Sequence, residues 1–171
     1  MLMLTVTLIL AAIISGFTGG IAKSQSKPPQ LLFEASMVHD TDTNSFLDIR
    51  IISVSEGIPT KDLKFQTEWR NQSNQINRCT ITPNSENVGT DTYPRGFGPG
   101  ITDGVAGASN FGNYTLLAGT RLNVNATVSE AMNDVLTPYW DEITEGTPVR
   151  IQFVHVPSGS IIADKEITAE T

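Results

Sequence analysis

The amino-acid sequence predicts an α+β chain that is mainly β, with a long N-terminal hydrophobic α-helix followed by an antiparallel β-sandwich head. Two observations predict this class. Residues 1–22 contain no charged side chain, whereas all 11 Lys and Arg and all 18 Asp and Glu lie in residues 23–171. Within residues 31–171, apolar and polar residues alternate in several short runs, which is the period of half-buried strands. We therefore divide the chain into a helix (1–22), a hinge (23–30) and a head (31–171).

The composition of the chain excludes several classes of protein. Its 171 residues are enough for one domain with an appendage, and a hydrophobic fraction of 39% is too high for a chain that is disordered throughout. The single cysteine, Cys79, excludes an intrachain disulfide and a cysteine-based metal cluster. The formal net charge of −7 argues against nucleic acid or an anionic membrane surface as the main partner.

The first 22 residues predict an apolar α-helix about 33 Å long, which is enough to cross the hydrocarbon layer of a membrane. Three interpretations remain open: a cleaved secretory signal, a plain membrane anchor, and a helix that packs against copies of itself. Small residues favour the last, because two adjacent stripes of them let helix backbones approach closely. The candidate helix-packing residues are Ala11, Ala12, Ser15, Gly16, Gly19 and Gly20.

The same segment begins with the letters MLML, continues through AAII and ends with SGFTGGIA. In this order it resembles the N-terminal segment of archaeal type IV pilins, a family in which such a helix precedes a β-rich head. The resemblance implies a structural subunit rather than an enzyme, and we expect no cofactor. It also implies that the helices bundle into the core of an extracellular surface filament, a pilus, while the heads face outward.

The resemblance further implies a set of partners. These are other copies of the chain in a helical homopolymer, the membrane before assembly, the pilus assembly machinery and, for adhesion, a receptor on a surface or another cell. Precursors in the family carry a short basic leader and further residues before the MLML stretch. We therefore expect the numbering to start at an internal methionine, or at the start of a processed or truncated form.

Two other functions remain as alternatives to a filament subunit. One is a membrane-anchored extracellular binding module that does not polymerise. The other is a secreted enzyme with a retained anchor. Loss of polymerisation on removal of residues 1–27, with a folded and otherwise inert head, would favour the filament subunit over both.

A polar hinge follows the helix in residues 23–30. Pro28 and Pro29 end any helix there, because proline lacks a backbone donor and restricts the residue before it. We expect a stiff, extended joint between the helix and the head.

The head predicts five strands from apolar–polar alternation. A turn at Pro157–Ser160 is expected to join the last two strands as a hairpin, and a short helix is expected at 130–136 with Ser129 as its N-cap. Alternation at this spacing predicts a two-sheet antiparallel sandwich of the Ig-like type. The predicted strands span residues 47–51, 63–70, 122–128, 149–153 and 161–168.

Two stretches of the head superficially resemble ligand-binding loops. Residues 95–113 hold six glycines but lack the lysine of a phosphate-binding loop, so they predict a long surface loop. Asp40, Asp42 and Asn44 alternate like the first ligands of a calcium loop. Ser45 stands where such a loop needs glycine, so a turn between two strands is the favoured interpretation.

No catalytic or metal-binding site is predicted. His39 and His155 are interpreted as structural residues. Ser24 and Lys27 have the spacing of a serine–lysine pair, but they lie in the hinge, where no fixed geometry is expected. Ser109 lacks the second glycine of a nucleophile elbow.

Three Asn-x-Ser/Thr sequons make the head a candidate glycoprotein: Asn71-Gln-Ser73, Asn113-Tyr-Thr115 and Asn125-Ala-Thr127. Asn125 falls on the polar positions of its predicted strand, which accessibility to a glycan requires. Glycans and negative charge together would keep heads hydrated and oppose lateral clumping.

Overall fold

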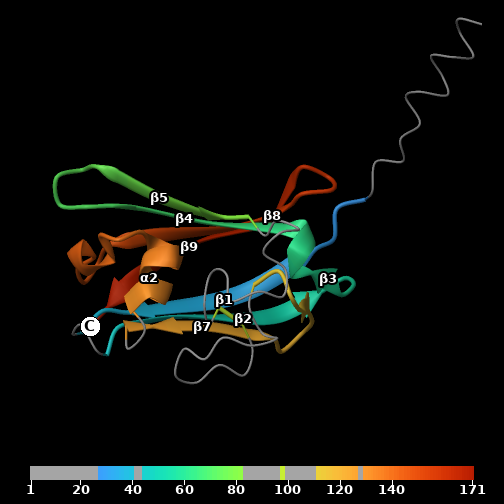
Figure 1. Cartoon of the computed structure of the whole chain (residues 1–171), viewed down its shortest axis with the longest axis horizontal. Coiled ribbons are helices and arrows are strands. Elements are labelled where there is room, and N and C mark those ends of the chain that lie inside the picture. Colours follow the sequence, from blue (N-terminus) through green and yellow to red (C-terminus); the bar gives the residue numbers. More distant parts are fainter. Residues whose placement is uncertain (1–26, 41–43, 83–96, 99–110, 127–128) are drawn as a thin grey trace, which may run out of the picture.

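The structure is a computed structural model of the chain, and it describes residues 27–40, 44–82, 97–98, 111–126 and 129–171 (Figure 1). Most of the regular structure in these residues is β-strand, which confirms the expectation of a mainly β chain. The predicted N-terminal helix lies outside the described residues.

Seven strands form one sheet with the order β5-β4-β8-β9-β1-β2-β7. This sheet curls over on itself, so that β5, β4, β8 and β9 form one layer and β1, β2 and β7 form the other (Figure 1). Two very short strands, β3 and β6, pair with each other. The strands are β1 (Leu31–Val38), β2 (Phe46–Val54), β3 (Ile58–Pro59), β4 (Leu63–Arg70), β5 (Ile76–Ile81), β6 (Thr115–Leu116), β7 (Arg121–Asn125), β8 (Pro148–His155) and β9 (Ser160–Glu170).

The two layers are joined where β1 and β9 pair in parallel. Met37 lies opposite Ala169, and Val38 lies opposite Glu170. β9 pairs with β8 only as far as Thr168. Beyond it, the N–H of Ala169 donates to the carbonyl oxygen of Thr147 at 3.0 Å, and the carbonyl oxygen of Glu170 accepts from the N–H of His39 at 2.7 Å. The prediction of two separate, wholly antiparallel sheets is therefore wrong at this junction, although the other pairs of described strands are antiparallel. The Ig-like type of sandwich stays a prediction.

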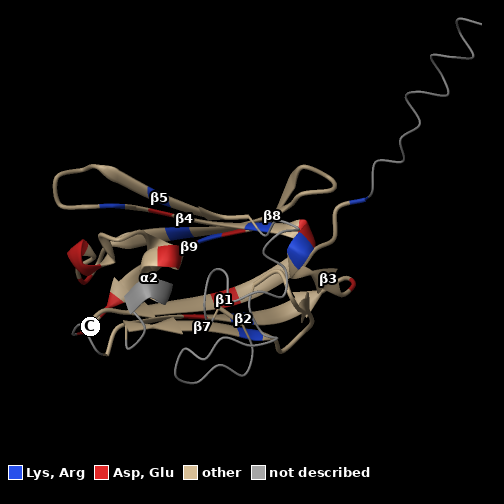
Figure 2. Cartoon of the chain, in the orientation of Figure 1, with Lys and Arg blue, Asp and Glu red and all other residues tan. Residues whose placement is uncertain are grey.

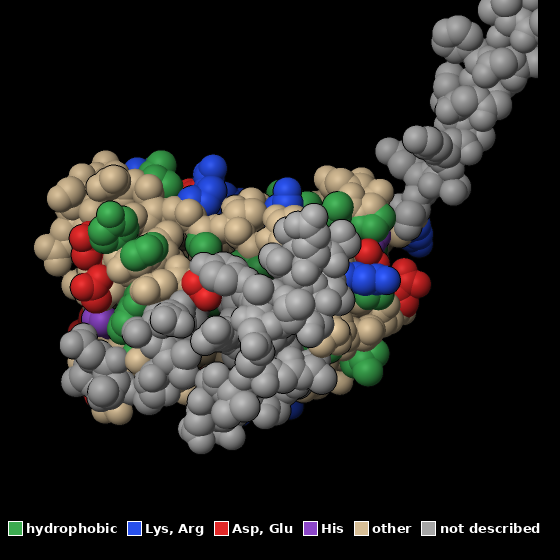
Figure 3. Space-filling view, viewed as in Figure 1, with side chains coloured by type: hydrophobic (Ala, Val, Ile, Leu, Met, Phe, Trp, Pro, Cys, Tyr) green, Lys and Arg blue, Asp and Glu red, His purple; other side chains and the backbone are tan. Residues whose placement is uncertain are grey.

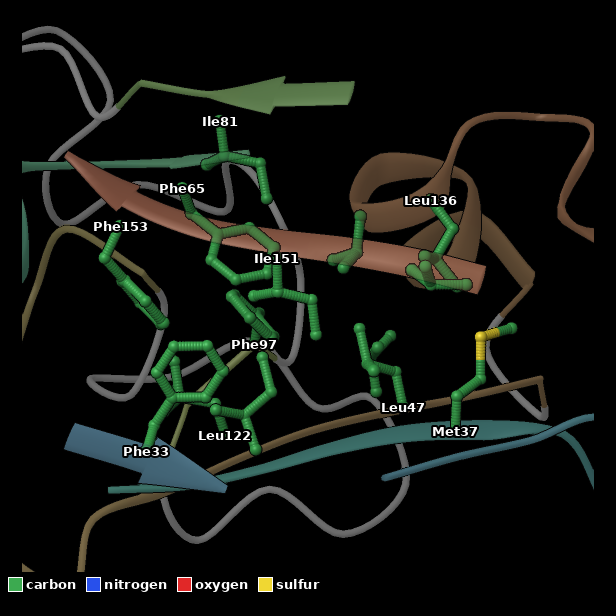
Figure 4. Packing of buried hydrophobic residues seen from close by; sticks show 14 of the residues in the cluster. Phe33, Met37, Leu47, Phe65, Ile81, Phe97, Leu122, Leu136, Ile151 and Phe153 are labelled. Atoms are coloured by element: carbon green, nitrogen blue, oxygen red, sulfur yellow. The ribbon is translucent and has the colours of Figure 1, made fainter. Parts of the chain in front are cut away.

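The core lies between the two layers and is built from alternate strand positions. In β4 the side chains at positions 63, 65, 67 and 69 are buried, whereas those at 64, 66 and 68 are only partly buried. The ring centroid of Phe65 lies 4.8 Å from that of Phe97 and 5.1 Å from that of Phe153. Phe153 in turn meets Phe33 of β1 at 5.3 Å, so aromatic contacts connect the two layers (Figure 4).

The helix α2 (Ser129–Leu136) confirms the predicted helical segment and contacts β4, β5 and β7. The final carbonyl groups of a helix have no partners within it. In α2 these carbonyl groups accept hydrogen bonds from side chains of β4 and β5: Thr67 Oγ1 to Val135, Trp69 Nε1 to Leu136 (2.8 Å) and Cys79 Sγ to Asp134 (2.9 Å). The predicted capping side chain of Ser129 is outside the part of the chain that is described.

Four of the predicted strands lie within β2, β4, β8 and β9 and are confirmed. The strand predicted at 122–128 is β7, which ends earlier, at Asn125, because Ala126 leaves the ladder and bonds its N–H to the carbonyl oxygen of Ser45 at 2.8 Å. The predicted turn between β8 and β9 is also confirmed. Gly159 adopts a φ of 67° there, which few residues other than glycine tolerate.

The head has two ends, which are defined by where the described chain begins (Figure 1). The proximal end lies near Lys27 and is formed by β3, the 3₁₀ helix η1 (Thr60–Asp62), the β6–β7 turn and the β8–β9 turn. The distal end is formed by the β1–β2 connection, the β4–β5 turn and the 3₁₀ helix η3 (Trp140–Glu142).

Candidate functional site

The N-terminal segment joins the head at a fixed point of the proximal end. The backbone N–H of Gln30 donates to Ser55 Oγ, and the backbone N–H of Ser55 donates to the carbonyl oxygen of Gln30, both at 3.0 Å. Pro29 is buried, whereas Lys27 is exposed. Hydrogen bonds to the residue that follows β2 therefore fix where the chain enters the head.

The six candidate helix-packing residues lie outside the described residues, so their role stays a prediction. They are Ala11, Ala12, Ser15, Gly16, Gly19 and Gly20. In the part of the chain that the structure describes, no helix is long and apolar enough to cross a membrane.

The outer face of the β5-β4-β8-β9 layer carries ion pairs (Figure 2). Arg78 donates from Nε to Glu68 Oε2 at 2.9 Å, and Arg150 donates from Nε to Asp164 Oδ1 at 2.9 Å. The hydrogen bond from Arg150 lowers the pKa of Asp164. Gln152 also donates to Asp164, at 3.0 Å. These charged side chains pair with one another across neighbouring strands. The face is therefore a polar, solvent-facing surface and not a binding site for a ligand of one charge.

An open, polar cleft of about 550 Å³ lies at the distal end, between the β4–β5 turn and η3. Asn71 helps to hold its walls together. Its Oδ1 accepts a hydrogen bond from the backbone N–H of Gln75 at 2.8 Å, and its Nδ2 donates to Glu142 Oε2 at 2.9 Å. The cleft is lined by amides, hydroxyls and carboxylates: Asn71, Gln72, Ser73, Gln75, Asp141, Glu142 and Thr144.

The three sequons differ in their surroundings. The side chain of Asn71 is half-buried and engaged at both of its polar atoms. Asn113 is exposed in the turn before β6. Asn125 lies on the opposite face of β7 from the buried Leu122 and Val124, as its predicted strand position required. Glycosylation of the three stays a prediction, and Asn113 is the most accessible of them.

The stretch considered as a calcium loop is the connection between β1 and β2, as the favoured interpretation required. Asp40 is exposed at its start, and Asp42 lies outside the described residues. Ser45 is fully buried, and its Oγ lies 3.1 Å from His39 Nδ1. The ring of His39 also packs edge-on against Trp140, with centroids 5.8 Å apart. These contacts tie the connection to η3.

Other candidate residues have structural surroundings or fall outside the description. His155 is buried, and its Nδ1 lies 2.9 Å from Ser158 Oγ in the β8–β9 turn. Ser24 and Ser109 are outside the described residues. Among the described residues, no group of three or more His, Cys, Asp or Glu side chains is arranged to hold a metal ion.

The prediction of a surface loop at 95–113 is wrong at four of the five residues of the stretch that the structure describes, since residues 97, 98, 111 and 112 are buried. Phe97 and Phe111 are buried in the core, with centroids 5.7 Å apart. Tyr114, just after the stretch, donates from its hydroxyl to the carbonyl oxygen of Phe97 at 2.9 Å, and burial raises the pKa of Tyr114 well above its usual value. The large aromatic side chains were the signal that sequence reasoning missed, because the surrounding glycines dominate the composition.

Comparison with known protein families identifies the N-terminal part of the chain. The family model for the archaeal type IV pilin N-terminal segment matches residues 1–33, a range that runs from the apolar segment through the hinge and into the start of β1. No curated protein matches the chain. Over its first 33 residues, therefore, the chain is similar to the N-terminal segment of the archaeal type IV pilin family.

Proposed function

We propose that the chain is the structural subunit of an archaeal type IV pilus-like filament and polymerises through its N-terminal helix. The observation that carries this proposal is the family match over residues 1–33, a range that contains the whole uncharged run. The folded β head, with ion pairs across its outer face, is suited to the water-exposed side of such a filament. The subunit has a structural rather than a catalytic role, and it is located in an extracellular filament.

Before and after assembly, the apolar helix would be kept out of water by different surroundings. The membrane holds the subunit first, and the helices of neighbouring copies then replace lipid as its partners. The helix therefore need not be exposed to water when it leaves the membrane. Many identical head-to-tail contacts that do not close generate a helical filament rather than a ring. Pilus assembly machinery would move the subunit from the membrane into the filament. The proposed role of the filament is adhesion to a surface or to a receptor on another cell.

Substitutions in the helix test the proposal. Ile13→Lys should abolish filaments, because a charge at the centre of an apolar helix costs about 2.5–3.5 kcal/mol on insertion scales.

Gly16→Leu should reduce filament number by blocking close approach of helices, whereas Leu8→Ile, which conserves volume, should change it little. Filaments would be counted by electron microscopy and their subunit identified by mass spectrometry. Intact filaments in the Gly16→Leu variant would contradict the small-residue packing.

The distal cleft favours one second candidate, a membrane-anchored extracellular binding module that does not polymerise. A cleft lined by amides, hydroxyls and carboxylates, with no basic side chain in its lining, is suited to a ligand that donates hydrogen bonds. Deleting residues 1–27 separates the two functions. A head that stays monomeric and retains binding of a ligand would favour the module, whereas an inert folded head with loss of polymerisation would favour the filament subunit.

A further inference from the structure

The exposed large hydrophobic side chains of the head are not evenly spread. Seven such residues are found in the described chain, and five of them lie either in the turns of the proximal end or where β1, β2 and β9 reach that end. Ile76 follows the β4–β5 turn and Tyr139 precedes η3, so both are at the distal end. Hydrophobic and acidic side chains lie close together on this side of the head (Figure 3). The five, which we call the proximal apolar residues, are Leu32, Ile52, Leu117, Val156 and Ile161.

Backbone pairing joins the three segments that carry Leu32, Ile52 and Leu117. The N–H of Gly119 donates to the carbonyl oxygen of Ile51, and the N–H of Ile51 donates to that of Thr120, both at 2.8 Å. These bonds hold the β6–β7 turn, which carries Leu117, against the strand that carries Ile52. Leu32 lies opposite Ser53, the residue after Ile52 in β2, so the three residues lie on neighbouring segments of one layer.

The other two proximal apolar residues belong to the β8–β9 hairpin. The N–H of Val156 donates to the carbonyl oxygen of Asp62 at 2.8 Å, which ties the hairpin to η1. Ile161 lies at the start of β9, opposite Val154, and is 57% exposed. All five side chains therefore lie on ordered elements at the end where the chain enters the head, three on one layer and two on the other. Exposed apolar side chains concentrated at one end of a domain are typical of interaction surfaces.

The charges at the two ends differ in a way that bears on the partner. Around the proximal end, the exposed Lys27 and Lys61 are balanced by Glu56 and Asp62. The distal end carries one exposed basic side chain, Arg70, and a larger acidic group (Figure 2). The acidic residues are Asp40, Asp141, Glu142, Glu145 and Glu170. Two distal ends would repel each other, whereas a proximal end offers apolar contact without a net charge to oppose it.

We infer that the proximal apolar residues form a contact surface for a second copy of this chain in the filament. The inference rests on the proposed function. The chain enters the head at this same end, through Gln30 and Ser55, so helices that bundle would bring neighbouring copies to it. Packed helices are separated by only about 8–10 Å, which leaves little room between the helix core and the heads around it. Apolar side chains at that position exchange water for protein contact when the filament forms.

Charge substitution in the full-length chain tests the inference. Leu117→Asp and Ile161→Asp, each made singly, place a charge on the contact surface. Ile76→Asp makes the same change at a comparably exposed residue of the distal end, and Leu117→Met preserves the apolar contact. Cells producing each variant would be scored for filaments by electron microscopy and for subunit in the membrane fraction. We expect about tenfold fewer filaments for the two proximal variants, with the subunit retained in the membrane, and normal filaments for the two controls.

Three results would overturn the inference: normal filaments in both proximal variants, an equal loss in Ile76→Asp, or loss of the subunit from the membrane, which would identify lipid as the occupant of the surface.

Ile13→Lys, made in parallel, separates this inference from the proposed function. If Ile13→Lys abolishes filaments and the proximal variants do not, only the contact surface is wrong. If Ile13→Lys leaves filaments intact, the proposed function itself is wrong.

Discussion

Thr67 shows how a single hydroxyl group joins the helix to the sheet. Its side chain is buried in β4, and its Oγ1 donates to the carbonyl oxygen of Val135 near the end of α2. A buried acceptor that loses its donor costs about 1–3 kcal/mol, more than the net gain from an average hydrogen bond. The side chain therefore contributes to stability through the helix end rather than through its own volume.

We expect Thr67→Val to lower the free energy of unfolding by about 1–3 kcal/mol, because valine keeps the shape of threonine and leaves the carbonyl group unpaired. Thr67→Ser, which keeps the hydroxyl group, is the matched control. Chemical denaturation of the two variants checks this expectation. Equal stability of the valine and serine variants would show that the hydrogen bond contributes nothing.

Thr137, directly after α2, is held in an unfavourable backbone conformation. Its φ is 90°, which is costly for a β-branched residue, and its Oγ1 is buried without a hydrogen-bond partner. We expect Thr137→Gly to be more stable than Thr137→Ala by about 1 kcal/mol, since both remove the hydroxyl group but only glycine tolerates this φ. Thermal unfolding measures the difference, and a more stable alanine variant would contradict the strain.

Asp164 provides a test of the outer-face ion pairs. The hydrogen bond from Arg150 lowers the pKa of Asp164 in the folded chain. A carboxyl group with a lowered pKa adds stability above its unfolded-state pKa and loses it as pH falls through the folded-state pKa. We expect Arg150→Gln to raise the pKa of Asp164 toward its usual value, as followed by NMR titration. Arg78→Gln, whose hydrogen bonds go to Glu68, should leave it unchanged; an unmoved pKa in Arg150→Gln is the contrary result.

At the scale of elements, alternation predicted the strands in which it is regular and failed where it is broken. In β1 the exposed Leu32 interrupts the buried positions of Leu31 and Phe33, so the run looks uniformly apolar. In β5 the order is inverted, because Ile76 is exposed and the polar Asn77 is buried. Both strands receive their inward and outward faces from their neighbours in the sheet, which local sequence does not encode.

Among the candidate sites, the sequence identified the sequons but not how accessible each asparagine side chain is to glycosylation. Asn71 and Asn113 have the same motif, yet the two hydrogen bonds of Asn71 depend on residues in the β4–β5 turn and in η3, which are far from each other in sequence. The distal cleft was missed for the same reason. Its lining combines two segments, and neither segment alone has a recognisable pattern.

The two turns therefore predict different glycan occupancy. We expect Asn113 to be modified in the native protein and Asn71 to be largely unmodified, because a glycan on Asn71 Nδ2 would compete with its hydrogen bond to Glu142. Mass spectrometry of peptides from the native protein, compared with an Asn113→Gln variant, measures occupancy at each sequon. Full occupancy at Asn71 with none at Asn113 would contradict this ranking.

At the scale of the whole molecule, the chain has unlike parts with separate roles. An uncharged N-terminal segment matches the pilin family, and the head that follows has an apolar proximal end, an acidic distal end and an ion-paired outer face. Both the entry of the chain and the exposed apolar side chains are at the proximal end. This polarity suits head-to-tail addition of copies, in which each subunit uses one end differently from the other.

Electron cryomicroscopy of the surface appendages of cells that make this protein tests the account most directly. Side-chain density should identify the chain as the repeating subunit, with the helices of residues 1–22 from neighbouring copies in contact at the filament core. Single copies embedded in lipid, whose N-terminal helices touch no other copy, would contradict it.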